Sequence, residues 1–404
     1  MKQHAIILSM RIKELPSYAR HTFHYDLRSG MLVGVFGGFL IPFIAIVGRK
    51  IGATDFQIAL LAAAPYLANA FALLWTEDIF GKGRVWYVVW PSVAGRALLL
   101  GMFYITSPGW YTALIFIYMV ITAVPFPSYA SIMKTNYPDE CRGRLMSYVR
   151  VGIAVFWIAS SAVAGWVLEK GTANYRYIFP LAAIFGVFSA LQFSSIKVRG
   201  EKRRKEPFNI AARIAGPFKD RAFIRFLLAY SLFEAGLLLS LPVYPLVLVD
   251  EVKISNLATG IYGAVFSGMW LAGFFFWGNI IDRKPIRLTL AAIFGTFCLV
   301  PLIYISSRDL FVLGIAQGVS GFMTAAIELA GYIVITKIST PEDVPRYMAA
   351  NIALGGLRGA VAPFIGTGLY AFAGATPVFS LSLLLGLSSV FLTWNLLKNL
   401  SFSS

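Results

Sequence analysis

Histidine and cysteine are scarce in this 404-residue chain, and the few present are poorly placed for chemistry. All three histidines (His4, His21 and His24) precede the first long apolar run, so we expect none to relay protons within a bilayer or to hold a metal. The two cysteines, Cys141 and Cys298, are too few for a disulfide framework. No G-x-x-x-x-G-K-[ST] motif occurs, so ATP is not the evident energy source. We therefore expect no cofactor.

Charge is also sparse: 13% of the residues are charged, whereas 58% are hydrophobic, and the mean hydropathy is +0.72. These values lie outside the range of water-soluble domains and indicate a polytopic membrane protein within a lipid bilayer. Apolar runs of about twenty residues mark transmembrane helices, because a backbone in hydrocarbon must satisfy its own hydrogen bonds. They predict an all-α fold of twelve spans, at 30 to 48, 56 to 76, 85 to 106, 110 to 133, 145 to 168, 174 to 196, 222 to 245, 257 to 280, 286 to 306, 310 to 337, 347 to 373 and 376 to 398.

The net charge of +16 is concentrated in loops, above all in a basic segment at the middle of the chain. This segment divides the chain into a tail (1–29), a six-helix bundle (30–196), a linker (197–221), a second six-helix bundle (222–398) and a tail (399–404). Cationic loops between apolar spans fit the retention of Lys and Arg in the cytoplasm better than they fit binding to nucleic acid. We therefore expect a multi-pass protein of the cytoplasmic membrane with both termini inside, and no nucleic-acid partner. This orientation leaves outside only Arg49, Lys50, Lys170, Arg176, Lys253 and Arg308, with Arg96 and Arg358 inside helices.

An internal repeat relates the two predicted bundles. Ser128-Tyr129, Lys134 and Pro138-Asp139-Glu140 in the first recur as Gly331-Tyr332, Lys337 and Pro341-Glu342-Asp343 in the second. Paired six-helix repeats are typical of transporter folds that bind a substrate between their halves.

One loop carries a family resemblance. The segment from Gly278 to Arg287, GNIIDRKPIR, resembles the G-x-x-x-D-R-x-x-x-R loop of the major facilitator superfamily, and a degraded counterpart surrounds Asp78. The resemblance implies a conformational latch in which Gly278 permits close helix approach and Asp282, with Arg283 and Arg287, stabilises one state. The alternative is that Asp282 and Arg283 are ordinary solvated loop charges.

Four ionisable residues fall inside predicted spans, where a charge needs a cavity or a partner. The resemblance implies that Glu234, Glu328 and Arg358 converge on the second-half side of a central cavity. Glu328 and Arg358 then either form a permanent pair that fixes packing or take part in transport, and proton coupling through Glu234 or Glu328 is left open. Arg96 lies on a peripheral span and is interpreted as structural.

The expected cavity has two unlike walls. Its first-half wall is mainly aromatic, whereas the second half adds hydrogen-bonding groups, so the cavity suits an organic molecule of mixed character better than a bare ion. Candidate site residues besides the charged ones are Tyr129, Gln317, Tyr332 and Asn351, and the aromatic wall comprises Phe36, Phe39, Phe43, Tyr66, Phe126, Tyr129 and Trp157.

We therefore predict a secondary active transporter of a small organic solute, working by alternating access, with proton coupling open and a monomer sufficient to form the site. The alternative is a transporter-shaped assembly factor or sensor, whose cavity its own side chains would fill. An enzyme is not expected, because no paired carboxylates, Cys-His set or Ser-His-Asp set lies at one membrane depth.

Overall fold

The computed structural model describes residues 15–75, 84–123, 126–138, 140–198, 216–339 and 343–396, and every regular element within them is helical. The first half consists of α2 (Ser17–Leu40), η2 (Ile41–Phe43), α3 (Ile44–Lys50), α4 (Asp55–Trp75), α5 (Arg84–Leu98), η4 (Leu99–Phe103), α6 (Pro108–Thr122), α7 (Phe126–Asn136), α8 (Arg142–Glu169), η5 (Thr172–Asn174) and α9 (Tyr175–Ser194). The second half consists of η6 (Gly216–Lys219), α11 (Arg221–Ser240), α12 (Val243–Leu246), η7 (Val247–Glu251), α13 (Asn256–Arg283), α14 (Ile286–Ser306), α15 (Leu310–Ile338), α16 (Val344–Ala373) and α17 (Ala375–Leu396).

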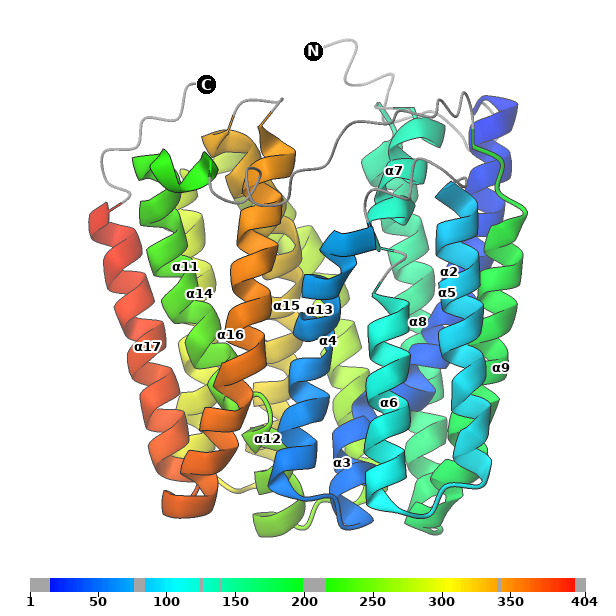
Figure 1. The fold of residues 1–404 in the computed structure, drawn as a ribbon, viewed down its shortest axis with the longest axis vertical. Coiled ribbons are helices and arrows are strands. Elements are labelled where there is room, and N and C mark those ends of the chain that lie inside the picture. Colours follow the sequence, from blue (N-terminus) through cyan, green and yellow to red (C-terminus); the bar gives the residue numbers. More distant parts are fainter. Residues whose placement is uncertain are drawn as a thin grey trace.

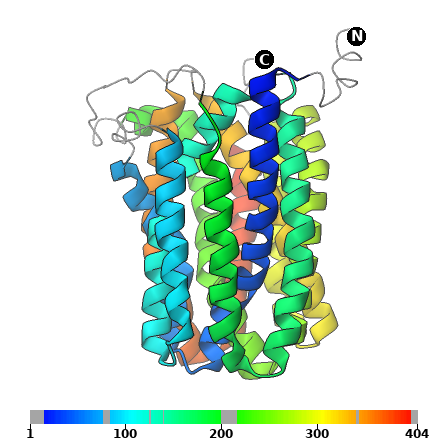
Figure 2. The ribbon, with the colours of Figure 1, turned by 90° about the vertical axis from the view of Figure 1, so that its right-hand side faces the viewer.

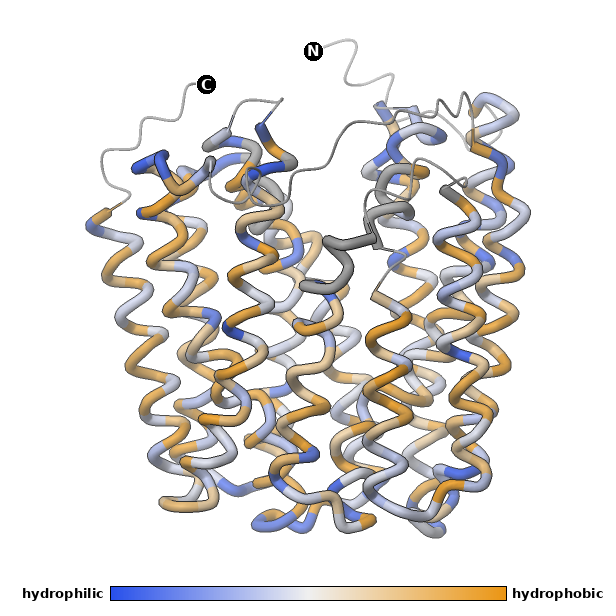
Figure 3. The backbone as a smooth tube through the Cα atoms, viewed as in Figure 1, coloured by the Kyte–Doolittle hydropathy of each residue, from blue (hydrophilic) through white to orange (hydrophobic). Residues whose placement is uncertain are grey.

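The predicted all-α membrane fold is confirmed. Each predicted span overlaps a described helix or, at 110 to 133, the two helices α6 and α7. By length and composition, ten stretches of the described chain can cross a membrane, and α6 is a shorter apolar helix. Hydrophobic residues dominate the middle of the bundle and hydrophilic ones gather toward both ends (Figure 3).

The two halves stand side by side, with α4 beside α16 and α8 beside α13 at their junction (Figure 1). Helix α2 begins and α17 ends at the same end of the bundle, which we call the terminal end (Figures 1 and 2). The opposite end carries the α3–α4 and η7–α13 connections.

The first helix is longer than the predicted span, because α2 begins at Ser17 rather than near residue 30. Its extra turns carry polar residues that the neighbouring helices bury. Thr22 accepts a hydrogen bond from Asn136 Nδ2 (3.0 Å), and Ser29 Oγ lies 3.0 Å from Ser189 Oγ. Hydropathy excluded these turns from the span, yet their polar groups are satisfied inside the protein.

Proline interrupts the first helix of each half at the same level. Pro42 lies in η2 between α2 and α3, and Pro242 lies between α11 and α12. A proline lacks the amide donor that a continuous helix needs, so both helices bend at these positions. The bends place the segments that follow them beside the junction of the halves.

Aromatic side chains fill the core of each half. Phe36, Phe39 and Phe43 are buried in the first half, so they contribute to packing there rather than to a cavity wall, contrary to the predicted aromatic wall. In the second half, Phe233 stacks on Phe294 with ring centroids 4.6 Å apart. Such contacts add to the dispersion attraction that packs helices in lipid.

Glycines bring α8 and α13 together toward the opposite end. A Cβ atom at Gly165 would lie 2.9 Å from the Asn256 carbonyl oxygen and 3.0 Å from the Gly260 Cα. Ser161 Oγ donates a 2.8 Å hydrogen bond to the Gly260 carbonyl. Only small residues permit backbones to approach this closely, so the two halves are in direct contact here.

Replacing Gly260 by Ala should therefore destabilise the contact by about 1–3 kcal/mol, because the added methyl group has no space. Gly278→Ala is a control on the same helix, since a Cβ there meets nothing within 4 Å. It should be neutral or slightly stabilising, because Ala favours helix by about 1 kcal/mol over Gly. Melting temperatures of the purified variants measure both effects. If the melting temperature rose equally in Gly260→Ala and Gly278→Ala, the close contact at Gly260 would be contradicted.

Candidate functional site

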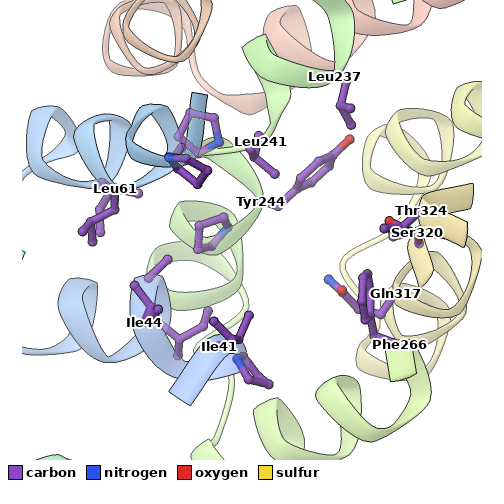
Figure 4. Close-up of a pocket in the computed structure, with 18 of the residues that line it drawn as sticks. Ile41, Ile44, Leu61, Leu237, Leu241, Tyr244, Phe266, Gln317, Ser320 and Thr324 are labelled. Atoms are coloured by element: carbon purple, nitrogen blue, oxygen red, sulfur yellow. Dashed lines mark hydrogen bonds between the residues drawn. The ribbon is translucent and has the colours of Figure 1, made fainter. Parts of the chain in front are cut away.

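A cavity of about 650 Å³ lies between the two halves near the proline bends. Figure 4 shows first-half residues such as Ile41, Ile44 and Leu61 on one side of it, and Tyr244 and Gln317 among the second-half residues facing them. Its full lining is Ile41, Pro42, Ile44, Ala45, Ile46, Ile58, Leu61, Ala62, Pro65, Tyr66, Asn69, Met119, Leu237, Leu241, Pro242, Tyr244, Pro245, Leu248, Phe266, Phe297, Val300, Tyr304, Gln317, Ser320, Met323 and Thr324. This volume is typical of sites for small organic ligands.

The polar groups of the cavity are few and unevenly distributed. Tyr66 and Asn69 belong to the first half, whereas Tyr244, Tyr304, Gln317, Ser320 and Thr324 belong to the second. Gln317 Nε2 donates to Tyr304 Oη at 3.4 Å, a long hydrogen bond. The predicted asymmetry is therefore present, but no charged residue is found in the wall formed by the described residues.

A smaller cavity of about 190 Å³ adjoins the main one and shares Pro42, Phe266 and Gln317 with it. Trp157 of α8 and Tyr262 of α13 line its far side. The Tyr262 hydroxyl is already bonded to the Leu310 carbonyl, so it holds a helix end rather than offering a free donor.

Arg358 and Glu234 form an ion pair beside the main cavity. Arg358 Nε donates to Glu234 Oε2 at 2.8 Å, and its Nη1 donates to Ser231 Oγ at 2.7 Å. Each side chain is only 14% exposed. Gly359, the next residue of α16, packs directly against the Tyr66 side chain of the cavity wall. The pair therefore lies behind the Tyr66 side chain of the cavity wall.

One of the two interpretations offered for Glu328 and Arg358, a pair between them, is wrong. Glu328 projects from α15 toward α8 and α13, where Arg150 Nη1 lies 3.0 Å from Glu328 Oε2 and Trp270 Nε1 donates to Oε1 at 3.0 Å. The Arg150 guanidinium also lies over the Phe274 ring, 4.0 Å from its centroid. Because Arg150 belongs to the first half, this ion pair joins the two halves. Glu328 and Arg358 thus have different partners on different faces.

The other predicted residues are dispersed. Tyr129 of α7 donates to Asp26 (3.3 Å), and the buried Asn351 Oδ1 atom has no hydrogen-bond partner among the described residues. Neither lines the cavity, and the Tyr332 side chain lies outside the described part of the structure. Arg96 donates to the Gly186 carbonyl at 2.5 Å and lies over the Phe36 ring, which is a packing role.

The predicted latch is only partly described. Asp78 and the Asp282 side chain lie outside the described part, and Arg283 is exposed at the end of α13. Arg287 lies over the Trp394 ring, 4.4 Å from its centroid, within the second half. In this structure no close helix approach occurs at Gly278, because a Cβ atom there would meet no described atom within 4 Å.

Sequence reasoning missed an ion pair across the halves at the opposite end. Arg49 donates to both carboxylate oxygens of Asp250, with Nη2 2.6 Å from Oδ2, and its Nη1 lies 2.9 Å from Asp55 Oδ1. Beside it, Lys50 Nζ donates to Asn256 Oδ1 at 2.8 Å. The only sequence signal was that Arg49 and Lys50 stand out among the few cations expected outside.

Asp26 was missed as well, because it was assigned to a tail. It lies on α2, only 2% exposed, and accepts a 2.8 Å hydrogen bond from Tyr137 Oη. No set of three His, Cys, Asp or Glu side chains suited to a metal comes together in the described ranges.

Two bundles of helices long and apolar enough to cross a membrane enclose a cavity between them, an arrangement typical of membrane transport proteins, and comparison with known proteins gives the family. The Major Facilitator Superfamily profile matches residues 27–320 and 226–401, so the chain belongs to that superfamily. No curated protein matches the sequence.

Solved structures share the fold at low sequence identity. A mutant of the nucleoside transporter NupG is 12% identical, with a TM-score of 0.71 over 93% of this chain and 99% of the other. A D-xylose–proton symporter is 11% identical, with a TM-score of 0.70 over 96% and 100%. A bacterial homologue of the human lysosomal transporter Spinster, in an inward-facing and occupied conformation, is 14% identical, with a TM-score of 0.63 over 94% of each chain.

The Glu234–Arg358 pair permits a sharp test. Replacing either residue alone by Gln leaves a largely buried charge without its partner and should lower the free energy of unfolding by roughly 3 kcal/mol. The double variant should recover most of this loss. The exposed pair Arg346–Asp343, with side chains 58% and 39% exposed, is the control. Replacing either of its residues should lower the free energy of unfolding by less than about 1 kcal/mol. Denaturation of the purified variants supplies the double-mutant cycle. Additive losses at Glu234 and Arg358 would show that the two side chains do not interact.

Proposed function

We propose that this protein is a secondary transporter that moves a small, largely apolar organic solute across the membrane by alternating access. The observation that carries the proposal is the cavity of about 650 Å³, formed jointly by both halves at the level of the proline bends. A site that straddles two bundles can be exposed to either side when one bundle rocks against the other.

The composition of the wall supports an uncharged or weakly polar substrate. In the described wall, aliphatic and aromatic side chains predominate and the polar groups are hydroxyls and amides, chiefly Tyr244, Gln317, Ser320 and Thr324. A charged solute would need a buried counter-charge, and the nearest ion pair, Glu234 with Arg358, is internally neutralised. A few directional groups in an apolar pocket are typical of recognition of mixed organic molecules.

The contacts between the halves support a defined conformational state. Toward the opposite end the halves are joined by Arg49 with Asp250, Lys50 with Asn256, and Glu169 with the Leu257 amide. With the termini in the cytoplasm, as the positive loops predict, this arrangement corresponds to closure on the outside. The Asp282 latch belongs to the same proposal, on the side that the positive loops predict to be cytoplasmic.

A transporter-shaped assembly factor or sensor is less well supported. Its expected feature is a cavity filled by the protein's own side chains, and the described residues instead leave a volume sufficient for a ligand. The family contains transporters with the same fold, which adds weight to transport.

Filling the cavity tests the site. Ala62→Trp places an indole in the wall and should abolish the rise in melting temperature that a bound solute produces, because a ligand that binds only the folded protein must stabilise it. Leu357→Trp, at a side chain 63% exposed, is the control and should keep that rise. A panel of uncharged organic solutes is screened against the wild-type protein first, and hits are tested for uptake into proteoliposomes. If the solute stabilised Ala62→Trp as much as the wild type, its binding site would lie elsewhere in the protein.

Removing the opposite-end ion pair tests alternating access. Arg49→Ala should shift the protein away from the closed arrangement at that end, so a cysteine at Ala45 should react faster with an impermeant thiol reagent. The background carries Ser at Cys141 and Cys298. Arg308→Ala is the matched control, because Arg308 pairs with Glu251 at the same end but within the second half. Equal labelling rates in the two variants would show that the Arg49–Asp250 pair does not hold the halves together.

A further inference from the structure

The smaller cavity, of about 190 Å³, forms a side compartment of the main one. Both halves line it, with Pro42 and Trp157 on the first-half side and Thr259 and Tyr262 on the second-half side. Gln317 lies in the walls of both cavities, and its amide is directed into the main one (Figure 4). The described part of the smaller cavity's wall contains no charged residue. The compartment can therefore hold an uncharged end of a molecule whose body lies in the main cavity.

The indole N–H of Trp157 is a buried donor that has no hydrogen-bond partner among the described residues. The indole N–H groups of two tryptophans on α13 do have partners: Trp270 donates to Glu328 at 3.0 Å, and Trp277 donates to the Phe322 carbonyl at 3.1 Å. A buried indole N–H usually finds an acceptor, because an unpaired donor away from water is unfavourable. Since an indole can donate but cannot accept, the group that Trp157 lacks is an acceptor.

Packing against α2 fixes the orientation of the Trp157 ring. A Cβ atom at Gly37 would lie 2.4 Å from Trp157 Cζ3 and 2.6 Å from Cε3, so this edge of the indole rests on the α2 backbone. The N–H group lies on the opposite edge of the ring and points away from Gly37. The donor is therefore held in place before any solute binds, which lowers the entropy cost of recognition.

The other polar groups of the smaller cavity narrow the chemistry of its occupant. The hydroxyls of Thr259 and Tyr262 already donate to backbone carbonyls. The Gln317 amide is held by its 3.4 Å bond to Tyr304, and an amide can both donate and accept. A ketone, amide or ether oxygen can accept from Trp157 and Gln317. A hydrocarbon would leave the Trp157 donor unpaired, and a carboxylate would find no cation in the described wall.

We propose that the smaller cavity binds the oxygen-bearing end of the transported solute, and that Trp157 makes the protein specific for uncharged solutes with an oxygen acceptor at one end of an apolar body. This rests on the proposed transport function and adds to it the chemical class of the solute. Trp157 belongs to the first half and Gln317 to the second. The oxygen is therefore recognised by both groups while the halves are together at this level, and separation of the halves there withdraws one of them.

Two probes that differ by a single oxygen test the specificity. The ketone 4-phenylcyclohexanone and the hydrocarbon phenylcyclohexane share one carbon skeleton, and their affinities are measured on the purified protein in lipid nanodiscs. One neutral hydrogen bond changes an affinity by about twofold to tenfold. The preference for the ketone over the hydrocarbon should therefore be larger by that factor in the wild type than in Trp157→Phe. Trp166→Phe is the matched control on α8, because the Trp166 side chain is 56% exposed, and it should keep the wild-type preference.

The infrared band of the bound ketone tests the hydrogen bond directly. The stretching frequency of an isotope-labelled carbonyl should be lower in the wild type than in Trp157→Phe, because a donated hydrogen weakens the C=O bond. Benzothienylalanine in place of Trp157 keeps the shape of the ring but has sulfur where the indole has N–H, and it serves if Trp157→Phe fails to fold. A wild-type preference and an unshifted band in the folded variant that lacks the N–H would overturn the role of Trp157.

The outcomes separate this inference from the proposed transport function. If both probes bound the wild type equally well and Ala62→Trp abolished the binding of both, the main cavity would bind solutes and the role of the smaller one would be overturned. Binding of neither probe to the wild type would overturn that role as well. The transport proposal fails by a different result, in which no solute of the uncharged panel stabilises the wild type or enters proteoliposomes.

Discussion

The free energy of removing a charge from water determines how this structure is arranged inside the membrane. Hydrocarbon offers an ionised side chain no solvation, so each must find an opposite charge, a hydrogen-bond donor or an aqueous path. The acids of the described spans show three solutions. Glu234 and Arg358 neutralise one another within the second half, Glu328 and Arg150 do so between the halves, and Asp26 relies on tyrosine hydroxyls. The wall that the described residues form around the cavity carries no charge.

The fold could be predicted from the sequence because its cause is local. A helix must satisfy its own backbone hydrogen bonds in lipid, so an apolar run of sufficient length predicts a span wherever it occurs. The repeat and the loop around Asp282 then predicted two related bundles of the major facilitator type. The start of α2 was predicted wrongly, because Thr22, Asp26 and Ser29 are polar in sequence but are satisfied by neighbouring helices in the structure.

The partners of the charged residues could not be predicted, because pairing depends on which face of each helix meets which neighbour. Glu328 and Arg358 lie on consecutive long helices, and the family resemblance implied that both face one cavity, where a pair between them was one of two interpretations. Rotation of α15 directs Glu328 to α8 and α13 instead, while Arg358 meets α11. Hydropathy carries little information on that rotation. The same limit applies to the cavity, of which Gln317 was anticipated and Tyr304, Ser320 and Thr324 were not.

The most buried ion pair of the described chain lies within one half, and the two pairs that join the halves are more exposed. The pair within one half, Glu234 with Arg358, is 14% exposed on each side, whereas Arg49 with Asp250 is 22% and 30% exposed and Arg150 with Glu328 is 31% and 41% exposed. Breaking a buried pair costs about 3–5 kcal/mol, but an exposed pair contributes only about 0–1 kcal/mol, because water replaces each partner. Two conformations that exchange must differ by only a few kcal/mol. The ion pairs between the halves are therefore ones that water can replace, whereas the most buried pair lies inside a single half.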